Sequence, residues 1–285
     1  MGERILVTGA TGNVGREVVR CLAANGGVEI VGAVRQLAEG AASGLPATRW
    51  VPFDFEDHAT FGPALAGIDR VFLVRPPQIE DITRTLGPFI SAARAAGVRH
   101  FVFLSLLGVE GNPFVPHRKV EDALRASGVP STMLRASFFM QNLDTTHRGE
   151  VRAGALQVPT GRGKTSFIDV RDIAAVGAKA LVGPPADGAW PLTGSEALDY
   201  FEVARILSEE LGREIRFANP GIFGFRRHQL KAGRPKAFVN VMMMIYLVVR
   251  LGRAGRVTDD VEQILGRKPI TLRTYARDYR DAWIG

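Results

Sequence analysis

The chain has 285 residues, of which 46% are apolar and 23% are charged, and it contains a single cysteine, Cys21. This composition is typical of a globular protein with a sizeable core, and it excludes an internal disulfide and a thiol-rich metal site. The net charge of +7 comes from the second half, because residues 1–150 hold 15 basic and 15 acidic residues whereas residues 151–285 hold 21 and 14.

The chain opens with a short apolar run, Ile5–Val7, which is followed by TGATGNVG and then by helical periodicity from Glu17. In this G-x-x-G-x-x-G spacing, Gly9 allows a tight turn, Gly12 lets the backbone approach a pyrophosphate, and Gly15 lets the helix pack against the strand. The helix N-terminus offers free N–H groups to the phosphates. The pattern predicts dinucleotide binding. We expect cofactor contacts at Gly9, Thr11, Gly12, Asn13, Val14 and Gly15.

The second predicted strand, Val28–Val34, ends at Arg35. About 20 residues past the glycines, an Asp or Glu would bind the ribose 2′-hydroxyl of NAD. Arg35 holds this position, and no acid lies within three residues on either side. Because a guanidinium can bind a 2′-phosphate through two hydrogen bonds, we expect NADP(H) in preference to NAD(H). The alternative is a surface arginine that follows a strand.

Strands and helices then alternate regularly. The further predicted strands are Trp50–Phe55, Arg70–Val74, His100–Leu104 and Ser131–Arg135. Such alternation predicts an α/β fold with a Rossmann-type doubly wound parallel sheet and helices on both faces. Since ligands bind at the carboxyl ends of these strands, we expect cofactor contacts there. The residues concerned are Asp54, Phe55, Val74, Arg75, Pro76 and Ser105. Asp54 is alternatively a helix N-cap.

Beyond residue 150 the predicted strands become short, as at Ser166–Val170, and the last third of the chain is predicted to be helical, ending in a helix over Thr271–Ile284. We expect residues 1–150 to form the NAD(P)-binding domain and residues 151–285 to form a smaller, mostly helical substrate lobe. Residues 151–200 are expected to return in part to the first domain. The N-terminal strand leaves no signal peptide before it, and one cysteine suits a reducing compartment, so we expect a cytoplasmic protein.

The segment Gly212–Arg256 carries ten basic residues and one acid, Glu214. It suits an anionic ligand, a membrane surface or nucleic acid, or it is a solvated basic face beside the cofactor. No nucleic-acid motif accompanies it, so we expect no nucleic-acid partner. The longest apolar run, Phe238–Val249, is shorter than the roughly 20 residues that span a bilayer. It is expected to pack in the core or in a homodimer interface rather than to anchor the chain.

Several longer motifs carry a family resemblance. They are ILVTGATGNVG, the arginine after the second strand, HRKVEDALRASGVPSTMLRASFFMQN from His117 to Asn142, SFIDVRDIA, PLTGSEAL and VTDDVEQILGRKPITLRTY. The chain resembles the NmrA-like family of atypical short-chain dehydrogenases/reductases over nearly its whole length. Within that family it is most similar to bacterial NAD(P)H-dependent reductases of quinones, azo dyes or triphenylmethane dyes. Redox-sensing members of the family bind the dinucleotide without turnover.

The resemblance implies a site without the usual tyrosine chemistry. Ordinary short-chain dehydrogenases use a Tyr-x-x-x-Lys pair, but the first tyrosine of this chain is Tyr200. His117 matches the histidine of the family pattern H-x-x-T/V-E, and we expect it to touch the nicotinamide ribose or to donate a proton. A helix-start histidine bonded to backbone is the alternative. An apolar wall for an aromatic acceptor is expected at Phe138, Phe139 and Met140, with Asn142 as its anchor.

Two functions follow from these expectations. The first is an NADPH-dependent reductase that transfers hydride to a flat, electron-poor acceptor such as a quinone or azo compound, without a metal. The alternative is a non-catalytic NADP(H)-binding redox sensor that regulates a partner protein.

Overall fold

The computed structural model describes residues 2–284 and divides the chain into two compact units. The first unit contains the residues up to Ala136 together with Val170–Leu192, and the second contains Ser137–Asp169 and the residues from Thr193 onward. The chain therefore leaves the first unit at Ser137 rather than at residue 150. This happens because the last strand before the crossing ends its sheet hydrogen bonds at Ala136.

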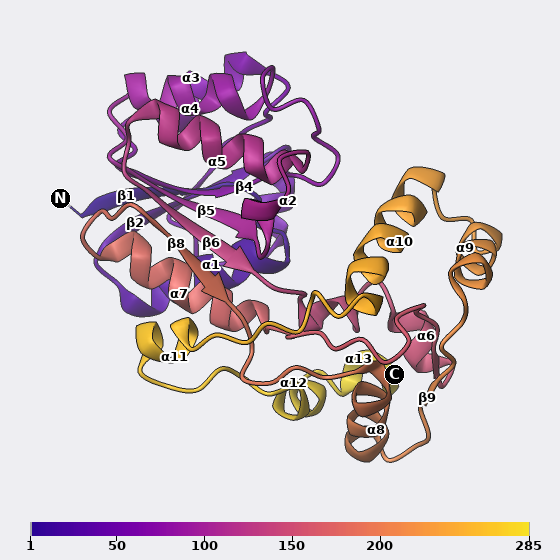
Figure 1. Cartoon of the computed structure of the whole chain (residues 1–285). Coiled ribbons are helices and arrows are strands. Elements are labelled where there is room, and N and C mark those ends of the chain that lie inside the picture. Colours follow the sequence, from indigo (N-terminus) through magenta and orange to yellow (C-terminus); the bar gives the residue numbers. More distant parts are fainter. Residues whose placement is uncertain (1, 285) are drawn as a thin grey trace. The chain divides into compact units, whose positions relative to one another are not determined.

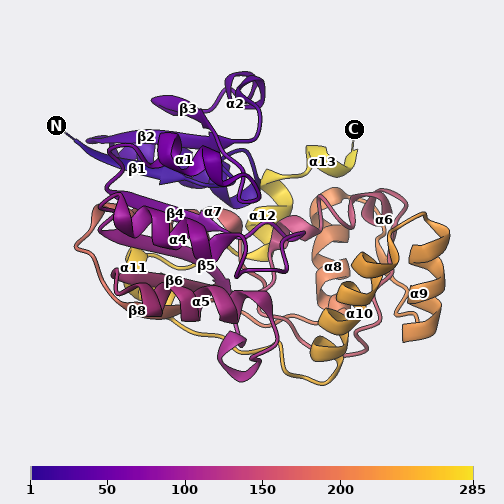
Figure 2. The same ribbon diagram turned by 90° about the horizontal axis from the view of Figure 1, so that it is seen from above.

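The first unit is built on a seven-stranded sheet in the order β3-β2-β1-β4-β5-β6-β8, in which every pairing is parallel (Figure 2). Its strands are β1 (Glu3–Val7), β2 (Val28–Val34), β3 (Arg49–Pro52), β4 (Arg70–Val74), β5 (His100–Leu106), β6 (Ser131–Ala136) and β8 (Gly188–Leu192). The central strands are near-continuous apolar runs because both faces of the sheet are covered. This topology confirms the predicted Rossmann-type doubly wound sheet.

Helices cover both faces of this sheet (Figure 1). On one face α1 (Asn13–Asn25) packs against α7 (Val170–Val182), and on the other lie α3 (Phe61–Leu65), α4 (Leu86–Ala95) and α5 (Pro116–Ser127). The short α2 (Leu37–Ala42) lies between β2 and β3 in the chain. Phe53, Phe55, Phe61 and Phe89 form an aromatic cluster in the core of this unit, with ring centroids 4.7 to 5.8 Å apart.

The second unit is mostly helical. Its elements are α6 (Arg148–Arg152), β7 (Ala155–Leu156), α8 (Tyr200–Leu211), β9 (Arg216–Phe217), α9 (Ile222–Lys231), α10 (Lys236–Arg250), α11 (Asp260–Leu265), α12 (Leu272–Asp278) and α13 (Asp281–Ile284). Phe167, Tyr200 and Tyr275 are among its fully buried core residues. The helix α8 begins with a capping box, in which Asp199 and Glu202 each accept the other's backbone N–H.

Two local expectations fail in this unit. The strand predicted over Ser166–Val170 is replaced by isolated bridges, such as Phe139 with Ile168, because no neighbouring strand runs alongside it. The helix predicted over residues 271–284 is divided into α12 and α13. Within residues 2–284, no helix has the length and apolar character needed to cross a membrane.

Candidate functional site

The turn between β1 and α1 presents an open helix N-terminus. Gly12 is the N-cap of α1, no side chain caps the helix, and the first turn carries no acid. The Gly12 N–H donates to the Gly9 carbonyl at 2.9 Å, so backbone alone closes the turn. Asn13 is exposed and Val14 is buried, so Val14 can meet a ligand only through its backbone. Free N–H groups of the first turn remain available for phosphate oxygens.

Backbone conformation and close contacts require glycine at two positions of this turn. Gly9 adopts a φ of 61°, which favours glycine, and a Cβ on Gly15 would collide with the Gly9 carbonyl. Thr8 is fully buried and ties β1 to β4: its hydroxyl donates to the Phe72 carbonyl at 3.1 Å and accepts the Val74 N–H at 2.8 Å. Val74, a predicted cofactor contact, therefore lies beside the glycine turn. Thr11 contributes its carbonyl, which accepts a hydrogen bond from the Arg16 guanidinium at 2.8 Å.

Arg35 follows β2 directly, and its side chain is exposed. No hydrogen bond or ion pair engages its guanidinium within residues 2–284. The parallel register pairs Val7 with Gly32, so β1 and β2 end at the same edge of the sheet. Gly9 and Arg35 therefore follow neighbouring strands at that edge, in the same unit. A free cation beside an uncapped helix N-terminus is an electrostatic environment suited to a polyanion.

The residues after β3 have other roles. Asp54 accepts a backbone N–H two residues further on at 2.9 Å, and the short turn that follows is capped by Asp57 instead. Phe55 is 4% exposed and packs edge-on against Phe53, with 4.7 Å between the ring centroids. The Phe55 ring therefore fills the core and presents no open face to a cofactor.

The loop after β4 is held together by Arg75. Its Nη1 donates to the carbonyls of Pro76 at 2.9 Å and Ile79 at 2.6 Å, which folds the side chain over its own loop. Burial lowers the pKa of Arg75, and Glu80 opposes this effect. Its buried Nε has no partner among the described residues. An unsatisfied buried donor is costly, so this loop carries a polar group without compensation next to the glycine turn.

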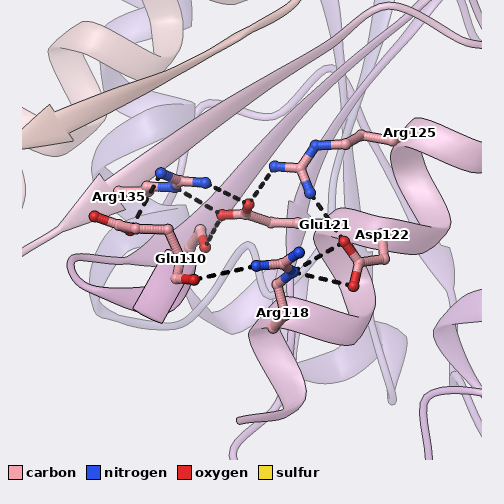
Figure 3. A network of polar contacts seen from close by, with 7 residues as sticks. Glu110, Arg118, Glu121, Asp122, Arg125 and Arg135 are labelled. Atoms are coloured by element: carbon pink, nitrogen blue, oxygen red, sulfur yellow. Dashed lines mark hydrogen bonds and ion pairs between the residues drawn. The ribbon is translucent and has the colours of Figure 1, made fainter. Parts of the chain in front are cut away.

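A buried carboxylate network joins β5, α5 and β6 (Figure 3). The fully buried Glu121 accepts hydrogen bonds from the Ser105 hydroxyl at 2.7 Å, Arg125 at 2.6 Å, and two nitrogens of Arg135 at 3.1 and 2.8 Å. Burial raises the pKa of Glu121, but these donors outweigh it and hold the pKa below its ordinary value. Arg135 also pairs with Glu110 at 3.2 Å. The Ser105 hydroxyl, which was expected to contact the cofactor, thus donates to Glu121 and helps to hold α5 on the sheet.

His117 lies in the first turn of α5, about one turn ahead of Glu121. Its ring packs near Phe103, with 6.0 Å between the centroids, and no hydrogen bond reaches its ring nitrogens from the described residues. The alternative of a backbone-bonded histidine is therefore not observed. Burial, reinforced by the positive charge of Arg75, lowers the pKa of His117 to about 4. The imidazole is neutral near pH 7, so this environment does not favour proton donation by His117.

The expected acceptor wall belongs to the second unit. β6 ends at Ala136, so Phe138, Phe139 and Met140 lie beyond the end of the sheet. Met140 is 2% exposed and lies in the core of its unit, where it has no face for a ligand. Phe138 and Phe139 are half-buried, and the Phe138 ring meets Phe167 edge-on.

Asn142, expected to anchor the wall, ends a short turn that begins at Met140. Its carbonyl accepts the His147 N–H at 2.9 Å, and its N–H donates to the Phe139 carbonyl at 3.2 Å. The backbone of Asn142 therefore holds this loop together within the second unit, while its side chain is half-buried.

A hollow of about 740 Å³ lies between α4 and α5 in the first unit, with Gly87, Arg94 and Ala123 in its lining, and it contains no predicted site residue.

Sequence reasoning overlooked Thr8 and Arg135. The available signals were a threonine between a buried strand and a glycine turn, and an arginine that ends an otherwise apolar strand. No group of metal-ligating side chains occurs within residues 2–284.

Comparisons with known proteins place this geometry in a family. The model of the NmrA-like family matches residues 1–260. NAD(P)H azoreductase of Xenophilus azovorans is 32% identical over 286 residues, covering 98% of this chain and 99% of that protein.

Two solved structures share the fold. One is the NADPH-dependent quinone oxidoreductase of Escherichia coli in complex with NADPH, with a TM-score of 0.87, 23% identity, and 96% and 99% of the two chains covered. The other is the negative transcriptional regulator NmrA in complex with NADP, with a TM-score of 0.80, 18% identity, and 98% and 96% covered. With its sequence matched over most of its length, the chain belongs to the NmrA-like family.

Proposed function

We propose that this protein is an NADPH-dependent reductase that transfers hydride to a flat, electron-poor acceptor such as a quinone or an azo compound. The protein is an NAD(P)H-dependent oxidoreductase, and its curated relatives include an NAD(P)H azoreductase and a further reductase. The observation that carries the finer proposal is the exposed, unpaired Arg35 at the same sheet edge as the open N-terminus of α1.

The cofactor fits the residues present. The uncapped first turn of α1 receives the pyrophosphate through backbone N–H groups, and Gly12 leaves room for its approach. Arg35 would hold a 2′-phosphate, which NADH lacks, through charge-assisted hydrogen bonds. When bound, the dihydronicotinamide supplies the hydride. We therefore propose NADP(H) as the preferred cofactor over NAD(H).

The proposed acceptor class follows from the proton donors of the first unit. No tyrosine precedes Tyr200, so the sheet unit has no tyrosine acid, and His117 is neutral with a pKa of about 4. The first unit thus offers neither a tyrosine nor, near pH 7, a protonated His117 to neutralise charge that develops on a reduced carbonyl. A quinone or azo acceptor delocalises the incoming electron pair over its own conjugated system and takes protons from water. Positioning and water exclusion are then the main contributions of the protein.

The proposal is tested by following NADPH oxidation with a panel of acceptors. Benzoquinones, naphthoquinones, azo dyes and triphenylmethane dyes form the test group, and simple aldehydes and ketones of similar size form the control group. The expected result is oxidation that depends on an added conjugated acceptor. Turnover of the simple carbonyl compounds alone, or no turnover at all, would contradict the proposed reaction.

A second candidate is an NADP(H) redox sensor that regulates a partner protein. It is supported by the regulator NmrA, which shares the fold and was solved with NADP, and by the lowered pKa of His117, which does not favour proton donation. A sensor would bind NADP⁺ and NADPH with clearly unequal affinity and would oxidise NADPH with no acceptor in the panel. Equal affinities together with turnover would rule it out.

A further inference from the structure

One side of α10 is apolar and exposed over the whole length of the helix. The opposite side is buried in the second unit through Val239, Met242, Tyr246 and Val249. The exposed apolar side chains of α10 and its C-cap are Phe238, Val241, Met244, Ile245, Leu247, Val248 and Leu251, and they are 39% to 63% exposed. At 3.6 residues per turn they cover about half of the helix circumference. A helix on a globular surface normally carries polar residues there, so this face marks an interaction site.

The same region is strongly basic. Between Ile222 and Arg256 the chain has eight Lys or Arg residues and no Asp or Glu. Arg226, Arg227 and Lys231 on α9 are exposed, as is Lys236, the first residue of α10, and none forms an ion pair with the described residues. The two helices pack against each other and lie side by side in both views (Figures 1 and 2). The surface thus combines an apolar helix face with unpaired cations.

We propose that the surface formed by α9 and α10 docks on an anionic lipid bilayer. The 15 residues of α10 extend over about 22 Å and lie in the plane of the interface, with the exposed apolar face among the acyl chains. The cations of α9 and Lys236 meet the lipid phosphates. The surface is defined by the second unit alone and does not rest on the proposed reductase activity.

The positive charge of this surface favours a bilayer over a second copy of the chain as its binding partner. Two copies packed through α10 would bring together two segments that each carry eight basic residues and no acid, and the repulsion would oppose association. An anionic bilayer supplies both an apolar medium and the missing negative charge.

The proposal is tested by sedimenting the full-length protein with vesicles. We expect it to pellet with vesicles of phosphatidylcholine mixed with phosphatidylglycerol, to stay in solution with phosphatidylcholine alone, and to be released by 0.5 M salt. The double variant Met244→Asp/Val248→Asp should lose this binding. Ile284→Asp, which places one such charge at another exposed apolar position, should keep it. The triple variant Arg226→Gln/Arg227→Gln/Lys231→Gln should bind about a hundredfold more weakly, at roughly fivefold for each cation.

Three outcomes would overturn the proposal: failure of the wild type to pellet with anionic vesicles, equal pelleting with neutral vesicles, and binding that resists salt. Analytical ultracentrifugation distinguishes the second copy as occupant. A dimer that dissociates in Met244→Asp/Val248→Asp, without vesicle binding by the wild type, would assign the surface to self-association. Circular dichroism checks that the variants are folded, and the salt dependence of the wild type decides the question if they are not.

Discussion

Replacing Glu121 with glutamine separates the charge of the buried network from its shape. The variant Glu121→Gln keeps the side-chain volume and one carbonyl oxygen, but an amide NH₂ takes the place of one accepting oxygen. In one orientation this NH₂ faces the donors of Arg125 and Arg135 that now lie 2.6 and 2.8 Å away. In the other it faces the Ser105 hydroxyl and the Arg135 Nε at 2.7 and 3.1 Å. In both orientations Arg135 loses a charge-assisted hydrogen bond and its compensating charge.

The expected loss of stability follows from burial. Breaking a buried ion pair by removing one partner costs about 3–5 kcal/mol. The Arg135 side chain is 16% exposed but that of Arg125 is 47% exposed, so water screens the second pair and the lower end of the range applies. We expect Glu121→Gln to lower the free energy of unfolding by about 3 kcal/mol. For a unit of this size the corresponding fall in Tm is about 6–12 °C.

Thermal unfolding followed by circular dichroism measures this change. Asp122→Asn is the matched control, because Asp122 lies next in the chain, is 51% exposed, and pairs with Arg118 and Arg125 at 3.0 Å on the surface. Its loss should cost at most about 1 kcal/mol. Equal falls in Tm for the two variants would refute the claim that the buried charge of Glu121 holds α5 on the sheet.

Three further predictions follow from the structure. The pKa of Glu121 is lowered in the folded state, so the stability that its charge supplies is complete above the ordinary glutamate pKa of about 4.3. This stability is lost as the pH falls through the lower pKa of the folded state. The Tm difference between the wild type and Glu121→Gln should therefore shrink in that pH range. His117 should titrate near pH 4 in an NMR pH series. Because the unfolded chain binds the proton more readily, protonation favours unfolding, and the contribution of His117 to stability should fall as the pH drops from about 6.5 to about 4. A titration midpoint near 6.5 would show that the ring is not buried as described. Gly15→Ala should destabilise the protein by about 1–3 kcal/mol and abolish dinucleotide binding, whereas Gly62→Ala, at a helical position with open space around it, should be neutral or slightly stabilising in denaturant unfolding.

The fold of the first unit was largely predictable because its signals are local. The glycine spacing, the apolar strands and their alternation with helices are read directly along the chain, and together they predict a parallel sheet with right-handed crossovers and helices on both faces. The domain boundary was less accessible. Nothing in the run from Arg135 to Asn142 signals that sheet pairing stops at Ala136 while the chain continues in extended form.

Side-chain roles at the sheet edge were harder to predict than the edge itself. From their positions after strands, Ser105 and Phe55 were predicted to contact the cofactor. In the structure the Ser105 hydroxyl donates a hydrogen bond to Glu121, and the Phe55 ring belongs to an aromatic cluster. Glu121 lies 16 residues from Ser105, and Phe89, another ring of the cluster around Phe55, lies 34 residues from it, so periodicity does not reveal either partner. The same reason explains why Arg135 was overlooked: its partners Glu110 and Glu121 become neighbours only when β6 and α5 are packed.

The claim on which the proposed function depends is that Arg35 recognises the 2′-phosphate of NADP(H). Titration of the wild type and Arg35→Asp with NADPH and with NADH, followed by nicotinamide fluorescence, tests it directly. NADPH binding should weaken by about 1–3 kcal/mol in the variant, while NADH binding, which serves as the internal control, should change little. Unchanged NADPH affinity in Arg35→Asp, or equal weakening for both dinucleotides, would contradict the claim.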